Sequence, residues 1–462
     1  MKTSKKINPL ILGTAILSAA GVISRIVGFL YRIFLSRTIG ASALGLYQLV
    51  FPIIALCYAI SFAGIQTAIS KYVAEGVASG SDGKSRSSRS IRYLIAGLAL
   101  SIALSIFCEI VLFLGSDQIA VHLLGDARCG ALLRILSYSI LPASIHSCIN
   151  GYYYGRKKTA VPAVGQLMEQ FARVGSVYLM YIVTAEQGIP LTATHAVWGI
   201  FFSELCGLLV GMTAIRITTA HPNAPASGTQ QTVSGNTQQT ANAATLSMRS
   251  AIAAVGAMAL PLTINQTLMH LFSSVENLLI PQSLRLYGLS ADESLAVNGV
   301  LSGMVISVIF FPCVLTNSLS VLLLPSVSEA AACKNGKKID RIISLAIRYG
   351  LLFGFGFTFL FLISGTFIGA VLFDNLLAGI LIRKLSWLCP MMYVYSLLCS
   401  VLHGLGQPKT VLTINLLASL MRIFIIWVLV PVHGLSALLW GMLLSQLFSS
   451  VAAMIAVRRI AL

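Results

Sequence analysis

Apolar blocks recur along the whole chain, separated by short stretches of charged or turn-forming residues. Each block is roughly 20 residues long, the length at which an α-helix spans the hydrocarbon core of a bilayer. The blocks lack the strict alternation of a barrel strand, and a backbone in lipid must satisfy its own hydrogen bonds, so each block predicts a transmembrane helix. The pattern indicates an all-α integral membrane protein with about twelve helices, at residues 10–34, 43–70, 91–115, 129–154, 159–184, 192–216, 250–281, 297–324, 342–373, 377–403, 409–431 and 434–457.

A polar segment at residues 218–248 divides these helices into two sets of six. It is rich in Ser, Thr, Gln, Asn and Ala and contains no Asp, Glu, Lys or Arg. Such a composition buries too little apolar surface to offset the entropy of ordering, which predicts a flexible cytoplasmic linker. We therefore expect an N-terminal six-helix lobe at residues 1–217 and a C-terminal six-helix lobe at residues 249–462.

The two halves also resemble each other in sequence. "ISKYVAEG" after the second helix corresponds to "VSEAAACKNG" after the eighth, and "NGYYYGRKKT" after the fourth corresponds to "HGLGQPKT" after the tenth. Three matched pairs are 258, 253 and 249 positions apart, namely Ser70 with Ser328, Gly151 with Gly404, and Arg173 with Arg422. Because each half holds an even number of helices, this predicts parallel repeats related by an axis along the membrane normal.

Composition and charge place the chain in a membrane and orient it there. Residues are 57% hydrophobic and only 10% charged, and the net charge is +17. With the N-terminus in the cytoplasm, 20 Lys and Arg residues fall in inside segments and 5 in outside loops. This bias predicts a multi-pass protein of the cell membrane with both termini cytoplasmic. It also explains the basic loops as topology signals that contact anionic lipid, without any nucleic-acid partner.

Two arginines within the first predicted helix are harder to explain. Arg25 and Arg32 are seven residues apart, nearly two helical turns, so they share one face about 10 Å apart. That helix contains no acidic residue, and charge within a bilayer is costly unless it faces a partner or a cavity. Guanidinium groups bind diphosphate and carboxylate in a bidentate manner. The pair therefore predicts an anion-binding track in a cavity, or else ion pairs with glutamates of other helices.

Acidic residues in the spans offer candidate partners. Glu276 lies in the seventh helix, the counterpart of the first, and should face the interface between the halves opposite Arg25. It is a candidate counter-ion, a proton or cation coupling site, or a structural partner. Glu169 and Arg173 are four residues apart on one helix face, which predicts a local ion pair.

Several classes of protein are disfavoured because their motifs are missing. The sequence holds no GxxxxGK[ST] loop, HExxH motif or nucleophile elbow, and no loop large enough for an enzymatic domain. Nine scattered cysteines without a CxxC pair predict neither a metal site nor disulfides. We expect a non-enzyme without a cofactor or nucleotide, so any transport would be passive or coupled to a cation such as H⁺ or Na⁺.

Residues 21–53, "GVISRIVGFLYRIFLSRTIGASALGLYQLVFPI", and 64–76, "GIQTAISKYVAEG", resemble a known family. They look like the opening of the stage V sporulation protein B and polysaccharide-biosynthesis flippase family. "PSVSEA" at 325–330 and "GLGQPK" at 404–409 are similar to its second half. The superfamily also holds the MurJ-type lipid II flippases and the multidrug and toxic-compound extruders.

The resemblance implies two six-helix lobes that form a V around a central cavity and move lipid-linked sugars by alternating access. In lipid II flippases an "SRxxGFxR" pattern in the first helix lines a cationic cavity that meets the diphosphate. Arg25 matches its first arginine, whereas Arg32 lies one residue later than its second. Family members usually have fourteen helices, and the final pair, which forms a groove for the lipid tail in lipid II flippases, is missing from the twelve expected here.

The sequence thus favours a flippase that moves a polyprenyl-diphosphate-linked saccharide, a cell-wall or polysaccharide precursor, from the inner to the outer leaflet. Arg25 and Arg32 are its candidate substrate-binding residues, and Glu276 is its candidate coupling or counter-ion residue. One alternative is a cation-coupled multidrug exporter of the same fold, which would require acidic residues to dominate the cavity. Another is a membrane scaffold for envelope or spore assembly that transports nothing.

Overall fold

The computed structural model describes residues 9–79, 83–220, 247–333 and 335–461. Within these residues every regular element is a helix, as the sequence predicts. The predicted linker 218–248 lies outside the described residues over positions 221–246. The elements of the first half are α1 (Pro9–Tyr58), η1 (Ala59–Ala63), α2 (Gly64–Ser79), α3 (Gly83–Gln118), η2 (Ile119–Leu124), α4 (Arg128–Ser137), α5 (Ile140–Gly155), α6 (Ala160–Glu186) and α7 (Ala193–Ala220).

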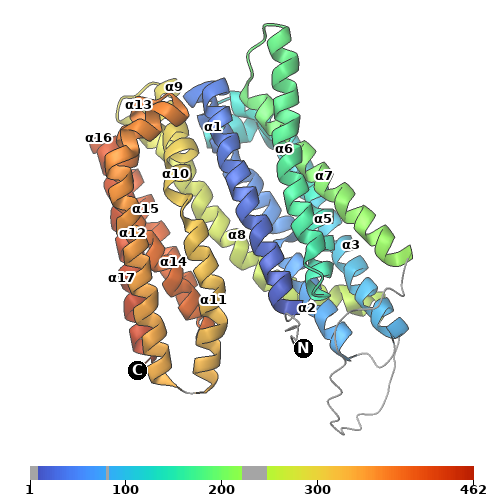
Figure 1. Cartoon of the computed structure of the whole chain (residues 1–462). Coiled ribbons are helices and arrows are strands. Elements are labelled where there is room, and N and C mark those ends of the chain that lie inside the picture. Colours follow the sequence, from blue (N-terminus) through green and yellow to red (C-terminus); the bar gives the residue numbers. More distant parts are fainter. Residues whose placement is uncertain (1–8, 80–82, 221–246, 334, 462) are drawn as a thin grey trace, which may run out of the picture.

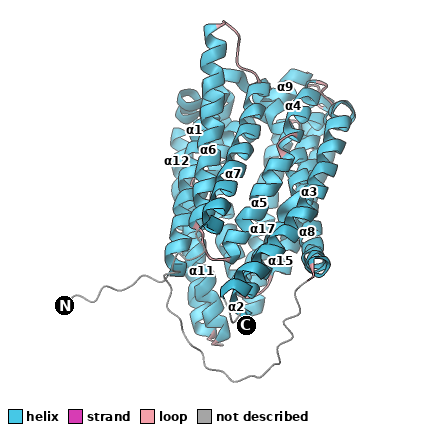
Figure 2. Cartoon of the chain, turned by 90° about the vertical axis from the view of Figure 1, so that its right-hand side faces the viewer, coloured by secondary structure: helices cyan, strands magenta, loops and turns pink. Residues whose placement is uncertain are grey.

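The second half has a similar succession of long helices and bent pairs. Its elements are α8 (Met248–Leu286), α9 (Ala291–Asn298), η3 (Gly299–Val305), α10 (Ile306–Phe310), α11 (Cys313–Ala332), α12 (Gly336–Phe373), α13 (Leu376–Leu385), α14 (Leu388–Gly404), α15 (Pro408–Val428), α16 (Val430–His433) and α17 (Leu435–Ala461). The helices of both halves run along a common long direction, joined by short loops (Figure 2).

The described helices agree with the predicted membrane spans. Eight are long and apolar enough to cross a bilayer, or ten if each bent pair, α4 with α5 and α13 with α14, is one span. One of the eight is the 61-residue stretch Ala15–Glu75. At about 1.5 Å per residue it would measure about 90 Å if straight, some three times the thickness of a bilayer core, so it contains two crossings.

A glycine separates these two crossings. Gly40 has φ 79° and ψ 173°, a backbone conformation open essentially to glycine alone. The bend falls between the predicted spans 10–34 and 43–70, so a single residue explains where the first span ends and the second begins.

The helices form two lobes arranged as a V (Figure 1). One lobe contains α1 to α7 and the other contains α9 to α17. Between α1 and α11 the lobes diverge toward the end of the molecule at which α1 begins and α17 ends, here called the terminus end. The opposite end, here called the α9 end, carries α9, α13 and the loop 125–127 before α4.

Helix α8 crosses between the lobes. Its first part packs on the N-terminal lobe, where Ala251, Val255 and Ala259 share an apolar cluster with residues of α2, α3 and α5. Its later part lies against α15, where Glu276 meets Arg422. The predicted C-terminal lobe 249–462 therefore begins with a segment that packs on the opposite lobe.

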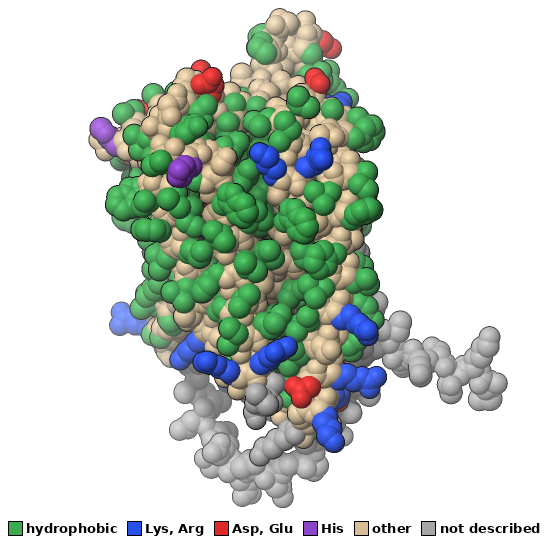
Figure 3. All heavy atoms as spheres, turned by 90° about the vertical axis from the view of Figure 1, so that its left-hand side faces the viewer, with side chains coloured by type: hydrophobic (Ala, Val, Ile, Leu, Met, Phe, Trp, Pro, Cys, Tyr) green, Lys and Arg blue, Asp and Glu red, His purple; other side chains and the backbone are tan. Residues whose placement is uncertain are grey.

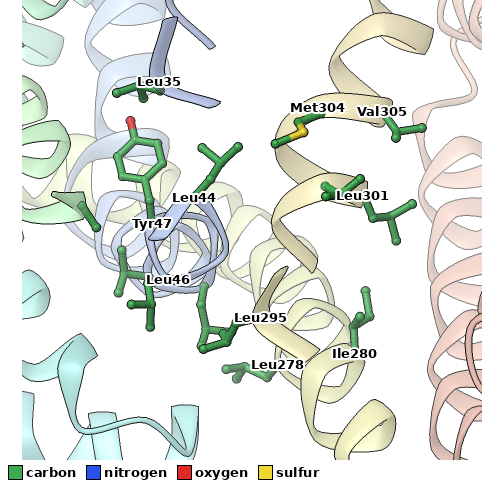
Figure 4. Packing of buried hydrophobic residues seen from close by; sticks show 14 of the residues in the cluster. Leu35, Leu44, Leu46, Tyr47, Leu278, Ile280, Leu295, Leu301, Met304 and Val305 are labelled. Atoms are coloured by element: carbon green, nitrogen blue, oxygen red, sulfur yellow. The ribbon is translucent and has the colours of Figure 1, made fainter. Parts of the chain in front are cut away.

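The lobes are in tight contact at the α9 end. A Cβ atom on Gly45 of α1 would lie 2.1 Å from the Leu295 carbonyl oxygen, and one on Gly299 of η3 would lie 2.1 Å from the Ala41 carbonyl oxygen. The backbones of α1 and η3 can approach this closely because positions 45 and 299 both lack a Cβ atom. Around them Leu44 of α1 faces Met304 of η3 in a continuous apolar cluster (Figure 4).

Polar contacts reinforce the closure at the α9 end. Arg128 Nη2 of the first lobe lies 2.8 Å from Asp292 Oδ1 at the start of α9. Arg37 Nε of α1 donates a 2.9 Å hydrogen bond to the Leu372 carbonyl oxygen of α12. Among the described residues, α1 packs closely against α9 and η3, whereas α11 has no comparable packing with the first lobe, so the lobes meet mainly at the α9 end.

The outer surface is that of a membrane protein. Large apolar side chains cover its middle, whereas many Lys and Arg side chains gather at the lower end in the view of Figure 3. On α12, Phe359 and Ile363 are 68% and 67% exposed. A ridge of this kind is stable in lipid rather than in water. The distribution of basic side chains agrees with the predicted orientation, which remains a prediction.

Candidate substrate-binding cavity

A cavity of about 800 Å³ lies between the two lobes. The first lobe contributes side chains from α1 and α6, and the second contributes side chains from α10, α11, α14 and α17. Its lining consists of Arg25, Gly28, Phe29, Tyr31, Arg32, Tyr47, Gln48, Phe51, Gln170, Arg173, Ile306, Ser307, Phe310, Phe311, Cys313, Met392, Tyr395, Ser396 and Gln446. The volume is in the range of sites that bind small organic ligands.

The cavity has a strongly cationic lining. Arg25, Arg32 and Arg173 all contribute to it, and among the described residues that line it there is no Asp or Glu. Three guanidinium groups around one space in a membrane protein produce a positive potential that attracts anions. Their planar donor geometry suits phosphate and carboxylate oxygens.

The structure brings the predicted pair Arg25 and Arg32 to the same cavity. The Arg32 guanidinium donates to Ser307 Oγ, which links α1 to α10 across the lobes. Gly28 lies between the two arginines, and a Cβ atom there would lie 3.3 Å from Gln170 Nε2. The glycine thus makes room for an amide of α6 on the arginine-bearing face of α1.

Arg173 is a cavity residue that sequence reasoning assigned to another role. Its Nη2 donates a 3.1 Å hydrogen bond to Ser203 Oγ of α7, which holds the side chain in place. The predicted local pair with Glu169 is not formed, because Glu169 Oε1 lies 3.3 Å from His146 Nε2 of α5 instead. The neighbouring helices offer each side chain a partner that the sequence of α6 alone could not reveal.

Glu276 does not line the cavity. Its Oε1 lies 3.0 Å from Arg422 Nε of α15, and both side chains are partly buried. Glu276 therefore pairs with Arg422 rather than with Arg25. Arg422 is the residue that corresponds to Arg173 in the sequence repeat. A coupling role for Glu276 remains a prediction.

The remaining lining combines aromatic rings and amides. Phe29 of the first lobe and Phe311 of the second have ring centroids 4.9 Å apart, so an aromatic pair bridges the lobes beside Arg25 and Arg32. Gln48, Gln170 and Gln446 contribute amide groups. Amides bind sugar hydroxyls by donating and accepting at once, and aromatic faces pack on apolar sugar faces.

The described side chains form no metal-binding cluster. Within the described residues no group of three or more His, Cys, Asp or Glu side chains could hold a metal ion. The three guanidinium groups of the lining can bind and orient an anion.

A family model and several known proteins match the sequence of this chain. The family described as "Polysaccharide biosynthesis protein" matches residues 10–282. Stage V sporulation protein B from Bacillus subtilis strain 168 is 25% identical over 418 residues, which cover 90% of this chain and 77% of that protein. Lipid II flippase MurJ from the same organism is 26% identical over 212 residues, which cover 44% of this chain and 38% of that protein.

A solved structure shows the same architecture. The inward-facing conformation of a multidrug resistance MATE family transporter of the MOP superfamily matches with a TM-score of 0.73 and 14% sequence identity. The match covers 95% of this chain and 94% of that chain. This match confirms the V-shaped two-lobe fold. The apolar helices and the family match show that the chain is a multi-pass membrane protein.

Proposed function

Since the chain belongs to the polysaccharide biosynthesis protein family and is a membrane protein of the flippase and exporter type, we propose that it moves a polyprenyl-diphosphate-linked saccharide from the inner to the outer leaflet. The cationic cavity between the lobes is the observation that carries this proposal. Transport proceeds by alternating access, in which the lobes rock about the bound headgroup.

The diphosphate is bound by the cavity arginines. Arg25 and Arg32 on α1 meet its oxygens from one helix face, and Arg173 on α6 completes the site. Charge-assisted hydrogen bonds of this kind are about twice as strong as neutral ones, and a low dielectric strengthens them further. Rejection of cationic ligands follows from the same charges, which disfavours the alternative of a cation-coupled exporter of cationic drugs.

The saccharide occupies the polar and aromatic part of the cavity. Gln48, Gln170 and Gln446 surround this space from three helices of both lobes. Because the lining comes from both lobes, a bound headgroup contacts both of them and can change their relative stability in each conformation. That arrangement is what a rocking mechanism requires.

The lipid tail leaves the cavity between the lobes. Phe310 and Phe311 line the cavity and are 50% and 40% exposed. On α1, Ile26 follows Arg25 and Leu30 lies one turn after Ile26, and these two side chains are 41% and 58% exposed. These exposed apolar groups offer the isoprenoid chain an apolar surface beside the cavity, without the extra helix pair that lines a groove in lipid II flippases.

In the proposed orientation, the cavity opens to the inner leaflet. The lobes close at the α9 end through Gly45, Gly299 and the ion pair of Arg128 with Asp292. With both termini in the cytoplasm, as the charge bias predicts, that closed end faces outward. A substrate made on the cytoplasmic side therefore reaches the cavity first.

Complementation of a flippase-depleted strain tests the proposal. Arg25→Ala should abolish growth rescue at normal membrane abundance, because it removes a diphosphate ligand without disturbing a packed core. Arg348→Ala is the matched control, since Arg348 is an exposed arginine of α12 that does not line the cavity. Full rescue by Arg25→Ala would remove the cavity arginine from the mechanism.

A further inference from the structure

A cluster of titratable side chains lies in the N-terminal lobe behind the cavity. Helices α5, α6 and α7 pack side by side there (Figure 1). His146 Nε2 of α5 lies 3.3 Å from Glu169 Oε1 of α6, and His146 Nδ1 lies 3.4 Å from Glu204 Oε2 of α7. His146 and Glu204 are each only 8% exposed. An imidazole thus lies between two carboxylates within the membrane-spanning part of the lobe.

The backbone is shaped to hold this cluster. A Cβ atom on Gly207 of α7 would lie 2.5 Å from Glu169 Oε1, so the glycine leaves the space that the carboxylate occupies. Gly207 lies one turn after Glu204 on the same helix. The close approach of α6 and α7 therefore places both carboxylates beside one histidine.

Protons, rather than a metal ion, suit the cluster. Two ionised carboxylates in a buried site repel each other, and each charge loses its hydration. A proton shared among the imidazole and the two carboxylates relieves both penalties, and such groups titrate as one unit. Within the described residues no group of His, Cys, Asp and Glu has a geometry for a metal ion.

Among the residues that the structure describes, four other titratable or charged groups lie within electrostatic reach of the cluster. Tyr58 of α1 and Arg173 of α6 face Glu204, and Tyr154 of α5 and Cys206 of α7 face Glu169. Arg173 is the only cation of this set.

Arg173 connects the cluster with the cavity. Its guanidinium lines the cavity, and it is held by Ser203, the residue next to Glu204. A change of charge at Glu204 is therefore felt by a group that faces the ligand.

We propose that His146, Glu169 and Glu204 form a proton-binding site whose occupancy is linked to anion binding in the cavity and so couples transport to protons. The linkage rests on the proposed function, because the anion is the diphosphate of the substrate. An ionised cluster draws the Arg173 guanidinium toward α7, whereas a proton taken from cavity water onto a carboxylate oxygen releases the guanidinium to the anion. By reciprocity the bound anion raises the proton affinity of the cluster, and the proton leaves after the headgroup departs.

Two measurements on the full chain in lipid nanodiscs test this inference. Infrared difference spectra between pH 5 and pH 9 report the protonation of buried carboxyl groups without any ligand. Calorimetric titration with farnesyl diphosphate, in two buffers of different ionisation enthalpy, counts the protons taken up on binding. Glu169→Gln and Glu204→Gln preserve shape and are measured separately, and Glu109→Gln in the α3 span serves as the control because Glu109 lies outside the cluster.

We expect a titrating carboxyl band in the wild type that both cluster variants diminish and Glu109→Gln retains. We also expect uptake of about one proton per ligand, with an affinity that falls up to about tenfold per pH unit above the titration midpoint in the wild type and stays flat in the cluster variants. A band that persists in both cluster variants would overturn the proton site. Binding that remains equally pH-dependent in those variants would overturn the linkage. If the wild type binds no farnesyl diphosphate at any pH, the proposed diphosphate cavity and its linkage fail, while the infrared spectra still decide the proton site.

Discussion

Substitution of Gly299 by alanine should open the α9 end of the molecule. The new Cβ atom would lie 2.1 Å from the Ala41 carbonyl oxygen, a backbone atom that cannot rotate away. Ordinary contact between these atoms needs a little over 3 Å, so η3 and α1 must separate by about 1 Å. Overpacking of this kind costs about 1–3 kcal/mol. Because the clash exists only when the lobes are closed at this end, the penalty falls on the closed conformation alone.

The equilibrium between the two conformations should therefore move by roughly 5- to 150-fold toward the conformation that is open at the α9 end. Spin labels at Gln187→Cys and Leu376→Cys, exposed sites at the α9 end of the two lobes, report this as a longer distance in a cysteine-free background. Gly356→Ala in α12 is the control, since a Cβ atom there meets nothing within 4 Å. Equal distance distributions in the wild type and Gly299→Ala would refute the view that this glycine contact holds the lobes together.

Three further predictions concern ion pairs. Burial raises the pKa of the Asp126 carboxyl, but hydrogen bonds from Arg128 outweigh burial and hold this pKa below its usual value. The stabilisation from this pair should therefore persist above about pH 4 and disappear only as the pH falls through the lowered pKa, and a loss already at about pH 6 in a thermal melt would contradict this. Asp292→Asn, which removes the exposed partner of Arg128, should shift the label distances less than Gly299→Ala, by the equivalent of about 1 kcal/mol or less, and a larger shift would refute this ranking. Glu276→Ala should destabilise the protein by about 1–3 kcal/mol, because it leaves the partly buried Arg422 guanidinium without its carboxylate, and a Tm unchanged from the wild type would show that the pair is dispensable.

The membrane-spanning helices of this fold could be predicted from the sequence because the bilayer constrains their composition and length. A helix in hydrocarbon needs an apolar surface along its whole length, so block length alone locates the crossings. The first crossing ends near Gly40, where the chain bends through a backbone conformation that suits glycine. The packing of the first part of α8 on the opposite lobe has no such signal, because a surface of Ala and Val packs on a neighbouring helix or faces lipid equally well.

Some residues of the candidate site could be predicted from the sequence and others could not. Arg25 and Arg32 were predictable because a charge in an apolar block requires an explanation, and their common face follows from helical spacing. The partners of Glu169 and Glu276 were not predictable, because each lies on another helix and helical spacing within one span does not show which neighbouring side chain it meets. His146 escaped notice because a single histidine in a span carries little signal until α6 and α7 bring carboxylates to it.

The central claim is that the cavity arginines bind the diphosphate of a lipid-linked saccharide during its passage between leaflets. Its most direct test is leaflet accessibility in proteoliposomes that contain the purified chain and a fluorescent polyprenyl-diphosphate-linked disaccharide, quenched by a membrane-impermeant reductant. Wild type and Arg348→Ala should make the inner-leaflet pool accessible at equal rates, whereas Arg25→Ala should slow this at least about tenfold, as expected for the loss of one charge-assisted contact worth about 1.5–3 kcal/mol. Equal rates for Arg25→Ala and the wild type, or no protein-dependent accessibility at all, would contradict the account.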